Sequence, residues 1–265
     1  MSKRVSAEAA LLMLHWQNSV CDPRGVWGKN LCRQIEKNGA IANAQRVLAT
    51  ARGRGLLTIF VNIGWRPGFP ELPENQHYPL LQGAKDENKG IVGTWEVDVI
   101  DALKPQTDEP IVVNYGSDSF EGTDLERILR ANNIGHLFVS GQCIEHVVAT
   151  TIKRAANMGY NAILIKDATS GFTDGNYNAM LDILPLYSKV ITASEFTLEA
   201  PFGGSARSTT FSPSAESFSE RMTRRRGFAV PRPPMNGNFA TRPSAAPIAL
   251  DLGRCGDRGV VGRAS

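Results

Sequence analysis

The sequence predicts an α/β fold, a three-layer α/β/α sandwich around a mostly parallel central sheet. Short apolar runs of strand length recur along the chain, longer segments with helical spacing separate them, and the runs are apolar throughout instead of alternating with polar residues. Strands covered by helices on both faces of a parallel sheet have this composition. The predicted strands span residues 9–14, 56–62, 110–114, 136–140, 161–167 and 189–193.

Helical patterns connect these strands. Apolar residues recur at intervals of three and four from Ile41 to Ala51, and Gly53 and Gly55 mark the end of that helix. Further helices are predicted from residue 125, from residue 147 to Gly159, and over residues 174–185. Thr123 and Glu126 have the spacing of a capping box at the start of the helix predicted from residue 125.

The carboxyl ends of the strands are where the functional site is expected, because ligands of parallel α/β sheets bind there. This expectation points to His15, to residues 114–120 and to residues 141–147. The segment 64–90 is long and rich in Pro, Asn and aromatic residues, so it is predicted to be a lid over the site.

The chain is predicted to have two parts, a hydrolase-like domain over residues 1–200 and a disordered tail over 201–265. The tail holds seven of the fifteen prolines and ten Arg against four acidic residues, a net charge of +6. Since the whole chain carries +3, residues 1–200 carry −3. A mildly acidic body gives no reason to expect nucleic acid as a partner.

The chain is expected neither to cross a membrane nor to be secreted. No apolar run approaches the roughly 20 residues of a membrane span, and the apolar stretch near the start is too short for a signal peptide. The expected location is the cytoplasm. The four cysteines form no CxxC pair, so neither a disulfide framework nor a thiolate zinc site is predicted.

Three sequence stretches carry a resemblance to a known family. ALLMLHWQNSV places Gln17 and Asn18 after the first strand, and VVNYGSDSFEGTDL follows the third strand. LFVSGQCIEHVVATTIKRAANMGY follows the fourth, with Gly141, Val148 and Gly159 fixing its register. In this order they resemble the isochorismatase-like, nicotinamidase-related cysteine hydrolases, a superfamily with the fold expected above.

The resemblance implies a catalytic Asp, Lys and Cys, and all three positions are substituted. His15 stands at the Asp position, Asn114 at the Lys position and Val147 at the Cys position. In the family the Cys attacks an amide carbonyl, the Asp takes its proton and the Lys stabilises charge. Val147 cannot attack and Asn114 carries no charge, whereas the imidazole of His15 can serve as a base or as a structural hydrogen-bonding group.

Cys143 raises the question of whether the nucleophile has moved. It lies four positions before Val147, with Glu145 and His146 beside it. Two interpretations stay open from the sequence: a displaced nucleophile, or a buried inert thiol.

Ligand binding is expected from further residues near the strand ends and the lid. The aromatic ones suit a planar small molecule, with ordinary packing as the alternative. The candidates are Gln17, Trp65, Tyr115, Phe120 and Gly141. No metal or other cofactor is predicted, because the histidines at 15, 77, 136 and 146 have no ligand spacing.

Two functions remain open from the sequence. One is a hydrolase for a small amide, ureido or cyclic carboxylate substrate, working through His15 with Cys143 or a water molecule. The other is a catalytically silent relative that binds a small molecule or a partner subunit. The resemblance implies a homo-oligomer, a dimer or a tetramer, in either case.

Overall fold

The computed structural model describes residues 8–74 and 77–198. These belong to the first of two units into which the chain divides, Met1–Arg207, and the second unit is Ser208–Ser265. The predicted tail, 201–265, therefore lies outside the described residues. Among the helices of the described part, none has the length and apolar character needed to cross a bilayer.

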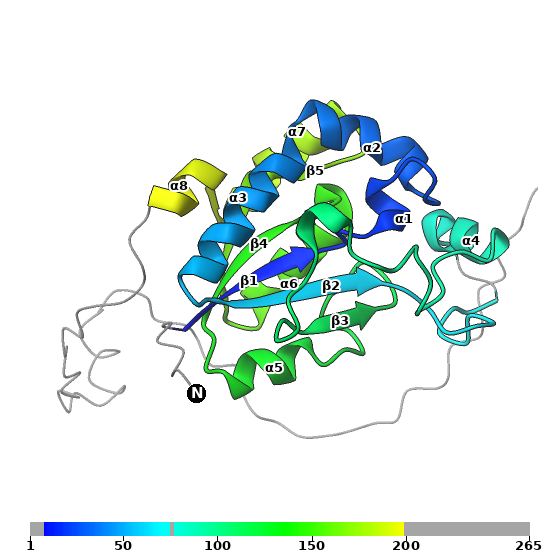
Figure 1. Ribbon diagram of the computed structural model, residues 1–265, viewed down its shortest axis with the longest axis horizontal. Coiled ribbons are helices and arrows are strands. Elements are labelled where there is room, and N and C mark those ends of the chain that lie inside the picture. Colours follow the sequence, from blue (N-terminus) through cyan, green and yellow to red (C-terminus); the bar gives the residue numbers. More distant parts are fainter. Residues whose placement is uncertain (1–7, 75–76, 199–265) are drawn as a thin grey trace, which may run out of the picture. The chain divides into compact units, whose positions relative to one another are not determined.

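A six-stranded sheet forms the centre of the described unit, in the order β3-β2-β1-β4-β5-β6 (Figure 1). All five strand pairings are parallel. The strands are β1 (Ala9–Leu14), β2 (Leu57–Ile63), β3 (Ile111–Asn114), β4 (His136–Gln142), β5 (Asn161–Ser170) and β6 (Lys189–Ile191). The six strands predicted from apolar runs are confirmed, and the sheet is parallel throughout.

Helices cover both faces of the sheet, which confirms the three-layer prediction (Figure 1). One core cluster joins the sheet to α1 (Asn18–Cys21), α2 (Gly28–Lys37), α3 (Ala40–Gly53) and α8 (Ala193–Leu198). A second cluster, on the other face, joins it to α5 (Leu125–Ala131), α6 (Ala149–Asn157) and α7 (Asp174–Ile183). The remaining elements are α4 (Pro79–Asp86) and the short turns η1 (Asp101–Leu103), η2 (Ile144–Val148) and η3 (Leu184–Leu186).

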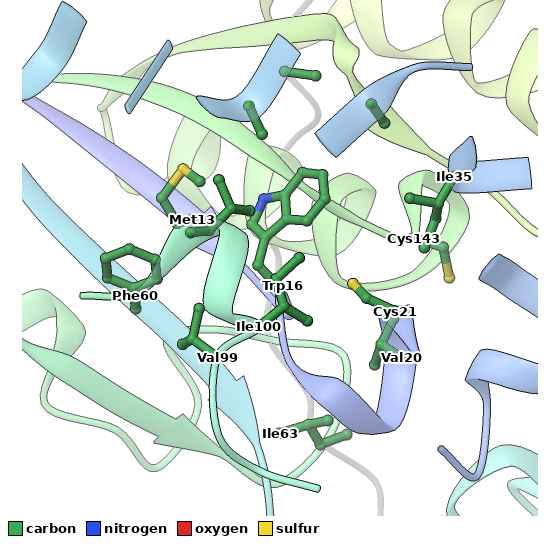
Figure 2. Close-up of a cluster of buried hydrophobic side chains, with 14 of the residues drawn as sticks. Met13, Trp16, Val20, Cys21, Ile35, Phe60, Ile63, Val99, Ile100 and Cys143 are labelled. Carbon is green, nitrogen blue, oxygen red and sulfur yellow. The ribbon is translucent and has the colours of Figure 1, made fainter. Parts of the chain in front are cut away.

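Strand β1 shows why the strands are apolar at every position. Leu11 and Met13 belong to the cluster under α1–α3, whereas Leu12 and Leu14 belong to the cluster under α5 and α6. Successive side chains of a strand point to opposite faces, so a central strand between two helical layers needs apolar residues at every position. Figure 2 shows the first cluster around the Trp16 indole, with Met13 and Phe60 on one side and Cys21 and Cys143 on the other.

Several local predictions were incomplete or wrong. The sequence patterns missed α1, α2, α4 and α8, and the predicted lid loop, 64–90, contains α4. The capping box does not form: the N-cap of α5 is Asp124, the Thr123 hydroxyl donates to the Ser119 carbonyl oxygen, and Glu126 pairs with Arg130. The Thr123 hydroxyl also accepts a hydrogen bond from the Leu125 amide, and the helix begins at Leu125, as predicted.

Candidate functional site

A pocket opens at the carboxyl ends of β1 to β5. Leu14 of β1 and Gly141 of β4 are paired in register, and the chain order reverses between these two strands, which is where α/β sheets place their ligands. The empty space of the pocket is about 400 Å³, including its opening to solvent. Its lining comprises His15, Val20, Trp27, Leu31, Ile63, Tyr78, Leu80, Leu81, Gly116, Ser117, Gln142, Cys143, His146 and Phe172.

The sequence-predicted position of the site agrees with this pocket. It draws on His15 after β1, on the start of α4 within the predicted lid, on Gly116 after β3 and on Cys143 after β4. These segments are far apart in sequence, and the parallel sheet brings them to one edge.

His15 and Asn114 form a direct buried pair at the floor of the site. The distance between His15 Nε2 and Asn114 Oδ1 is 2.9 Å. Asn114 Nδ2 donates to the carbonyl oxygens of Gly116, at 2.8 Å, and Asp118, at 3.3 Å. These two carbonyls fix the orientation of the Asn114 amide, so its oxygen faces the imidazole. His15 Nε2 therefore carries the proton and donates it, which leaves Nδ1 as the unprotonated nitrogen.

The environment of His15 keeps its imidazole neutral. Burial lowers its pKa to about 4, an effect that the hydrogen bond to Asn114 opposes and the nearby His146 reinforces. Its backbone has a φ of 52°, a left-handed conformation that non-glycine residues adopt mainly at special sites.

Gln142 is buried in the pocket lining without a hydrogen-bond partner. It is the last residue of β4 and is 1% exposed. Among the described residues neither its amide nitrogen nor its amide oxygen finds a partner. Buried polar groups are almost always paired in proteins, so an unpaired amide beside a cavity calls for an explanation.

Cys143 lines the same pocket but is held as a thiol. Burial is the main reason that its pKa lies well above the ordinary value, and the neighbouring Glu145 raises it further. Glu145 Oε1 accepts hydrogen bonds from the Phe172 backbone nitrogen and from Asn176 Nδ2, both at 2.9 Å. Glu145 thus fixes the chain after β5 that carries part of the pocket wall.

Aromatic rings form one side of the pocket. The Tyr78 ring is stacked on the His146 imidazole, with 6.2 Å between centroids, and Phe172 meets the same imidazole edge-on at 5.9 Å. Tyr78 Oη and His146 Nδ1 are also within 3.3 Å. Burial lowers the pKa of His146, so this imidazole is also largely neutral at pH 7.

The other predicted catalytic position, Val147, does not line the pocket. It is fully buried in the cluster on the opposite face of the sheet, in the kinked turn η2. The kink is at His146, whose φ of −110° and ψ of −107° are not helical. The chain between β4 and α6 is therefore an irregular turn.

The five predicted binding residues have structural contacts and are not among the lining residues. Gln17 Nε2 donates to Ser19 Oγ and to the Ile63 carbonyl oxygen, both at 2.9 Å, and Gln17 Oε1 accepts from the Ile63 amide at 2.6 Å. Trp65 Nε1 donates to the Tyr115 carbonyl oxygen. The Trp65 ring lies edge-on against Trp27, which lines the pocket, so Trp65 supports the pocket wall from behind.

Phe120 and Gly141 have other roles. Phe120 stacks on Tyr160 on the opposite face of the sheet. A Cβ at Gly141 would lie 2.5 Å from the Leu14 carbonyl oxygen, so glycine allows β1 and β4 to approach closely here.

Sequence reasoning did not single out Trp27, Tyr78, Gln142 and Phe172 as pocket residues. Gln142 and Tyr78 lie within segments expected at the site, 141–147 and 64–90, so their positions gave a usable signal. Trp27 and Phe172 lie in connecting segments whose positions depend on the tertiary fold, and no local pattern distinguishes them.

The pocket carries no formal charge on its described lining. Asp, Glu, Lys and Arg are all missing from these lining residues, and both histidines have lowered pKa values. Within residues 8–74 and 77–198, no group of three His, Cys, Asp or Glu side chains is arranged to hold a metal ion.

Comparisons with known proteins agree with this architecture. A family model described as the isochorismatase domain matches residues 9–195. The ureidoacrylate amidohydrolase RutB of Variovorax paradoxus (strain S110) is 27% identical over 175 residues, covering 62% of this chain and 69% of that protein.

Two solved structures show the same fold. A cysteine hydrolase from Pseudomonas syringae pv. phaseolicola 1448A superposes with a TM-score of 0.64 at 21% identity, covering 72% of this chain and 91% of that chain. An isochorismatase-like hydrolase from Alkaliphilus metalliredigens gives a TM-score of 0.60 at 23% identity, covering 72% and 98% respectively.

Proposed function

This chain belongs to the isochorismatase family of hydrolases, and from that premise we propose that it is a member that binds a small molecule in its pocket without hydrolysing it. The observation that carries the proposal is the hydrogen bond from His15 Nε2 to Asn114 Oδ1, at 2.9 Å. A neutral, hydrogen-bonded pair of side chains therefore stands at the two positions where the resemblance implies a carboxylate and an ammonium group.

A competent nucleophile is the first missing requirement for amide hydrolysis. Val147 stands at the position of the family's Cys, is aliphatic and is fully buried on the far face of the sheet. Cys143 does line the pocket, but its raised pKa keeps the sulfur protonated at neutral pH, and the thiolate is the reactive form.

Charge stabilisation is the second missing requirement. An amide hydrolase must stabilise an oxyanion, and preorganised charge in a site that excludes water contributes strongly to that task. The Asn114 amide nitrogen is already used by the Gly116 and Asp118 carbonyl oxygens, and its oxygen faces His15. Loss of several cooperating catalytic groups together removes most of the rate enhancement of an enzyme.

The pocket itself is retained, and this supports binding as the remaining role. The cavity opens to solvent, and its lining combines apolar walls with the polar side chains of His15 and Gln142. RutB is named as a ureidoacrylate amidohydrolase, and our proposal is that the present chain keeps a related cavity without that chemistry.

The test is a turnover assay combined with a binding assay on the purified full chain. Amides, ureido acids and isochorismate are incubated with wild-type protein, H15A and C143A, and products are followed by mass spectrometry. We expect no turnover by any of the three proteins, together with ligand-dependent stabilisation of the wild type in thermal unfolding. Turnover by the wild type that H15A or C143A abolishes would overturn the proposal.

A restored triad tests the placement of the three positions. The triple variant H15D/N114K/V147C returns the residue types that the resemblance implies. We expect no covalent adduct with an electrophilic amide-site reagent, because position 147 is fully buried and lies outside the pocket lining. An adduct at position 147 in the folded variant would contradict this placement.

A second function has one specific observation in its favour. His15 lines the pocket and its Nδ1 is unprotonated, so this nitrogen can accept a proton from a water molecule. A hydrolysis of this kind would need no thiol. It predicts turnover that persists in C143A and disappears in H15A, a pattern that the same assay detects.

A further inference from the structure

We propose that the surface at the end of α7 and along η3 is a contact between two copies of this chain. Ile183, Leu186 and Tyr187 define this α7–η3 face. The face shares no residue with the pocket lining. The inference therefore goes beyond the proposed function, which concerns the pocket alone.

An unusual density of exposed apolar side chains marks the α7–η3 face. Within residues 8–74 and 77–198, six large apolar side chains are exposed, and three of them lie in the short segment 183–187. Ile183 is 36% exposed, Leu186 is 79% exposed and Tyr187 is 41% exposed. Single exposed apolar residues are normal on a protein surface, whereas a contiguous group of them is typical of an interaction site.

The other exposed apolar side chains form no comparable group. The Arg24 guanidinium lies over the Trp95 ring, 4.5 Å from its centroid, so this indole is partly covered from within the chain. Val92 lies in the same loop as Trp95. Ile111 stands by itself at the start of the edge strand β3. In the described part of the chain, the α7–η3 face is thus the place where apolar exposure is concentrated.

Helix α7 is also poorly covered on its inner side. Each of the helices α1 to α6 has at least two buried residues, whereas α7 has none over its ten residues. Its apolar residues Tyr177, Met180 and Leu181 pack on the second core cluster but are only partly buried. A surface helix normally buries one apolar stripe. A body packed against the outer side of α7 would complete the burial that the single chain leaves unfinished.

The charges beside the α7–η3 face indicate which body this is. Asp182 precedes Ile183 on α7, and Lys153 Nζ of α6 lies 5.6 Å from the centroid of the Tyr187 ring. Neither Asp182 nor Lys153 has an ion partner among the residues that the structure describes. The apolar group therefore has one unpaired acid and one unpaired base beside it.

A face with this charge pattern is complementary to itself. In a two-fold contact the same patch serves both copies, so each pairing between two different residues occurs twice. Asp182 of each copy can then lie opposite the partner's Lys153, with the apolar side chains between the two ion pairs. A partner of one predominant charge would satisfy only one of these residues and repel the other, which favours a second copy of this chain.

The first experiment measures the oligomeric state of L186D, with I111D as the matched control. Both variants place a carboxylate at an exposed apolar position, one on the α7–η3 face and one on the edge strand β3. Sedimentation velocity of the full chain is recorded over a range of concentrations. We expect a dimer for the wild type and for I111D. L186D should raise the dissociation constant at least about tenfold, because it buries a charge in the apolar centre of the contact.

The fold of L186D is checked separately. Leu186 is largely exposed in the single chain, so the far-UV circular dichroism of L186D should match that of the wild type. A wild type that stays monomeric, a dimer that L186D leaves intact, or equal weakening by L186D and I111D would each overturn the proposal. A tetramer that L186D converts into a dimer would support it, since a tetramer holds a second, independent contact.

A charge exchange tests the choice of a second copy. K153E and D182K each place like charges opposite one another across the two-fold contact, and each should raise the dissociation constant at least about threefold. The double variant K153E/D182K restores opposite charges and should recover most of the affinity. Recovery is specific to a contact of the face with itself. A double variant as weak as the sum of the two single variants would contradict the pairing of Asp182 with the partner's Lys153.

Discussion

His15 and Asn114 show how one substituted pair changes the character of a site. The Asn114 amide is oriented by two backbone carbonyl oxygens, and this orientation determines which imidazole nitrogen of His15 is protonated. A neutral imidazole hydrogen-bonded to a neutral amide needs no counter-ion, so the pair is compatible with an apolar pocket. The same neutrality removes the charge that hydrolysis of an amide would use.

The buried His15 predicts a loss of stability in mild acid. Its pKa is about 4 in the folded protein, below the ordinary 6.5, so the unfolded chain binds the proton more readily between these values. The free energy of unfolding should therefore fall as the pH drops from 6.5 towards 4, by about 3 kcal/mol for this group. His146, whose pKa is also lowered, acts in the same direction.

Urea unfolding of wild type, H15Q and H77Q between pH 7.5 and 4.5 measures this effect. H15Q should show a flatter dependence on pH than the wild type, because it lacks the group whose proton affinity differs between the two states. H77Q changes an exposed histidine and should follow the wild type. An identical slope for H15Q and wild type would contradict the neutral buried His15.

At this scale the sequence identified part of the site. His15 and Cys143 were predicted because they stand at strand ends, and both line the pocket. Gln17, Phe120 and Gly141 also stand near strand ends, yet their side chains or backbone contacts serve the protein interior. Which way a side chain faces after a strand depends on the turn that follows, and the residue pattern does not encode that direction.

At the scale of elements, the contact between β1 and β4 positions the pocket. Gly141 lies where β4 passes Leu14, and a Cβ there would be 2.5 Å from the Leu14 carbonyl oxygen and 2.6 Å from the Leu14 Cβ. The pocket residue His15 directly follows β1, and β4 ends at the pocket residue Gln142. The spacing of the two strands therefore controls the separation of these groups.

The variant G141A should lower the free energy of unfolding by about 2–3 kcal/mol, because the strands must separate to accept the methyl group. G53A is the matched control: a Cβ at Gly53, the last residue of α3, meets no atom within 4 Å. That change should be neutral or stabilising by up to about 1 kcal/mol. Chemical unfolding of both variants checks the difference, and a G141A protein as stable as the wild type would refute the close approach.

The elements were predictable to different degrees. The strands have apolar residues on both faces, and this signal does not depend on what packs against them. Helices α2 and α4 bury few apolar side chains, Leu31 and Ile35 in one and Leu81 and Ala84 in the other, which is too few for a visible helical period. Their helical form depends on packing at the pocket edge, so the sequence alone did not show it.

At the scale of the whole molecule, α8 completes the described body. Phe196 is 1% exposed and packs edge-on against Phe138, with 4.8 Å between ring centroids. Arg54 donates to the carbonyl oxygens of Phe196, at 2.9 Å, and Thr197, at 2.8 Å. These contacts fix the last described helix to α3 and the sheet.

Deletion of residues 201–265 leaves all of these contacts in place, so the thermal midpoint of the body should stay within about 2 °C of that of the full chain. A change below roughly 0.5 kcal/mol in the free energy of unfolding shifts the thermal midpoint of a domain of this size by no more than about this amount. F196A in the full chain should instead cost about 3–5 kcal/mol, the usual range for removing a buried phenylalanine side chain. Differential scanning calorimetry of both proteins provides the test. A large shift on deletion would show that the C-terminal segment packs on the body.

The anchoring of α8 also determines where the chain can be attached to a surface. Phe196 packs on Phe138 near the start of β4, whereas Cys143 follows the end of the same strand, so α8 and the pocket lie at opposite ends of the sheet (Figure 1). The last described helix, α8, therefore lies at the end of the sheet away from the cavity. A biosensor tether or an affinity handle attached directly after α8, in a chain shortened to end there, would sit at the end of the sheet away from the pocket opening.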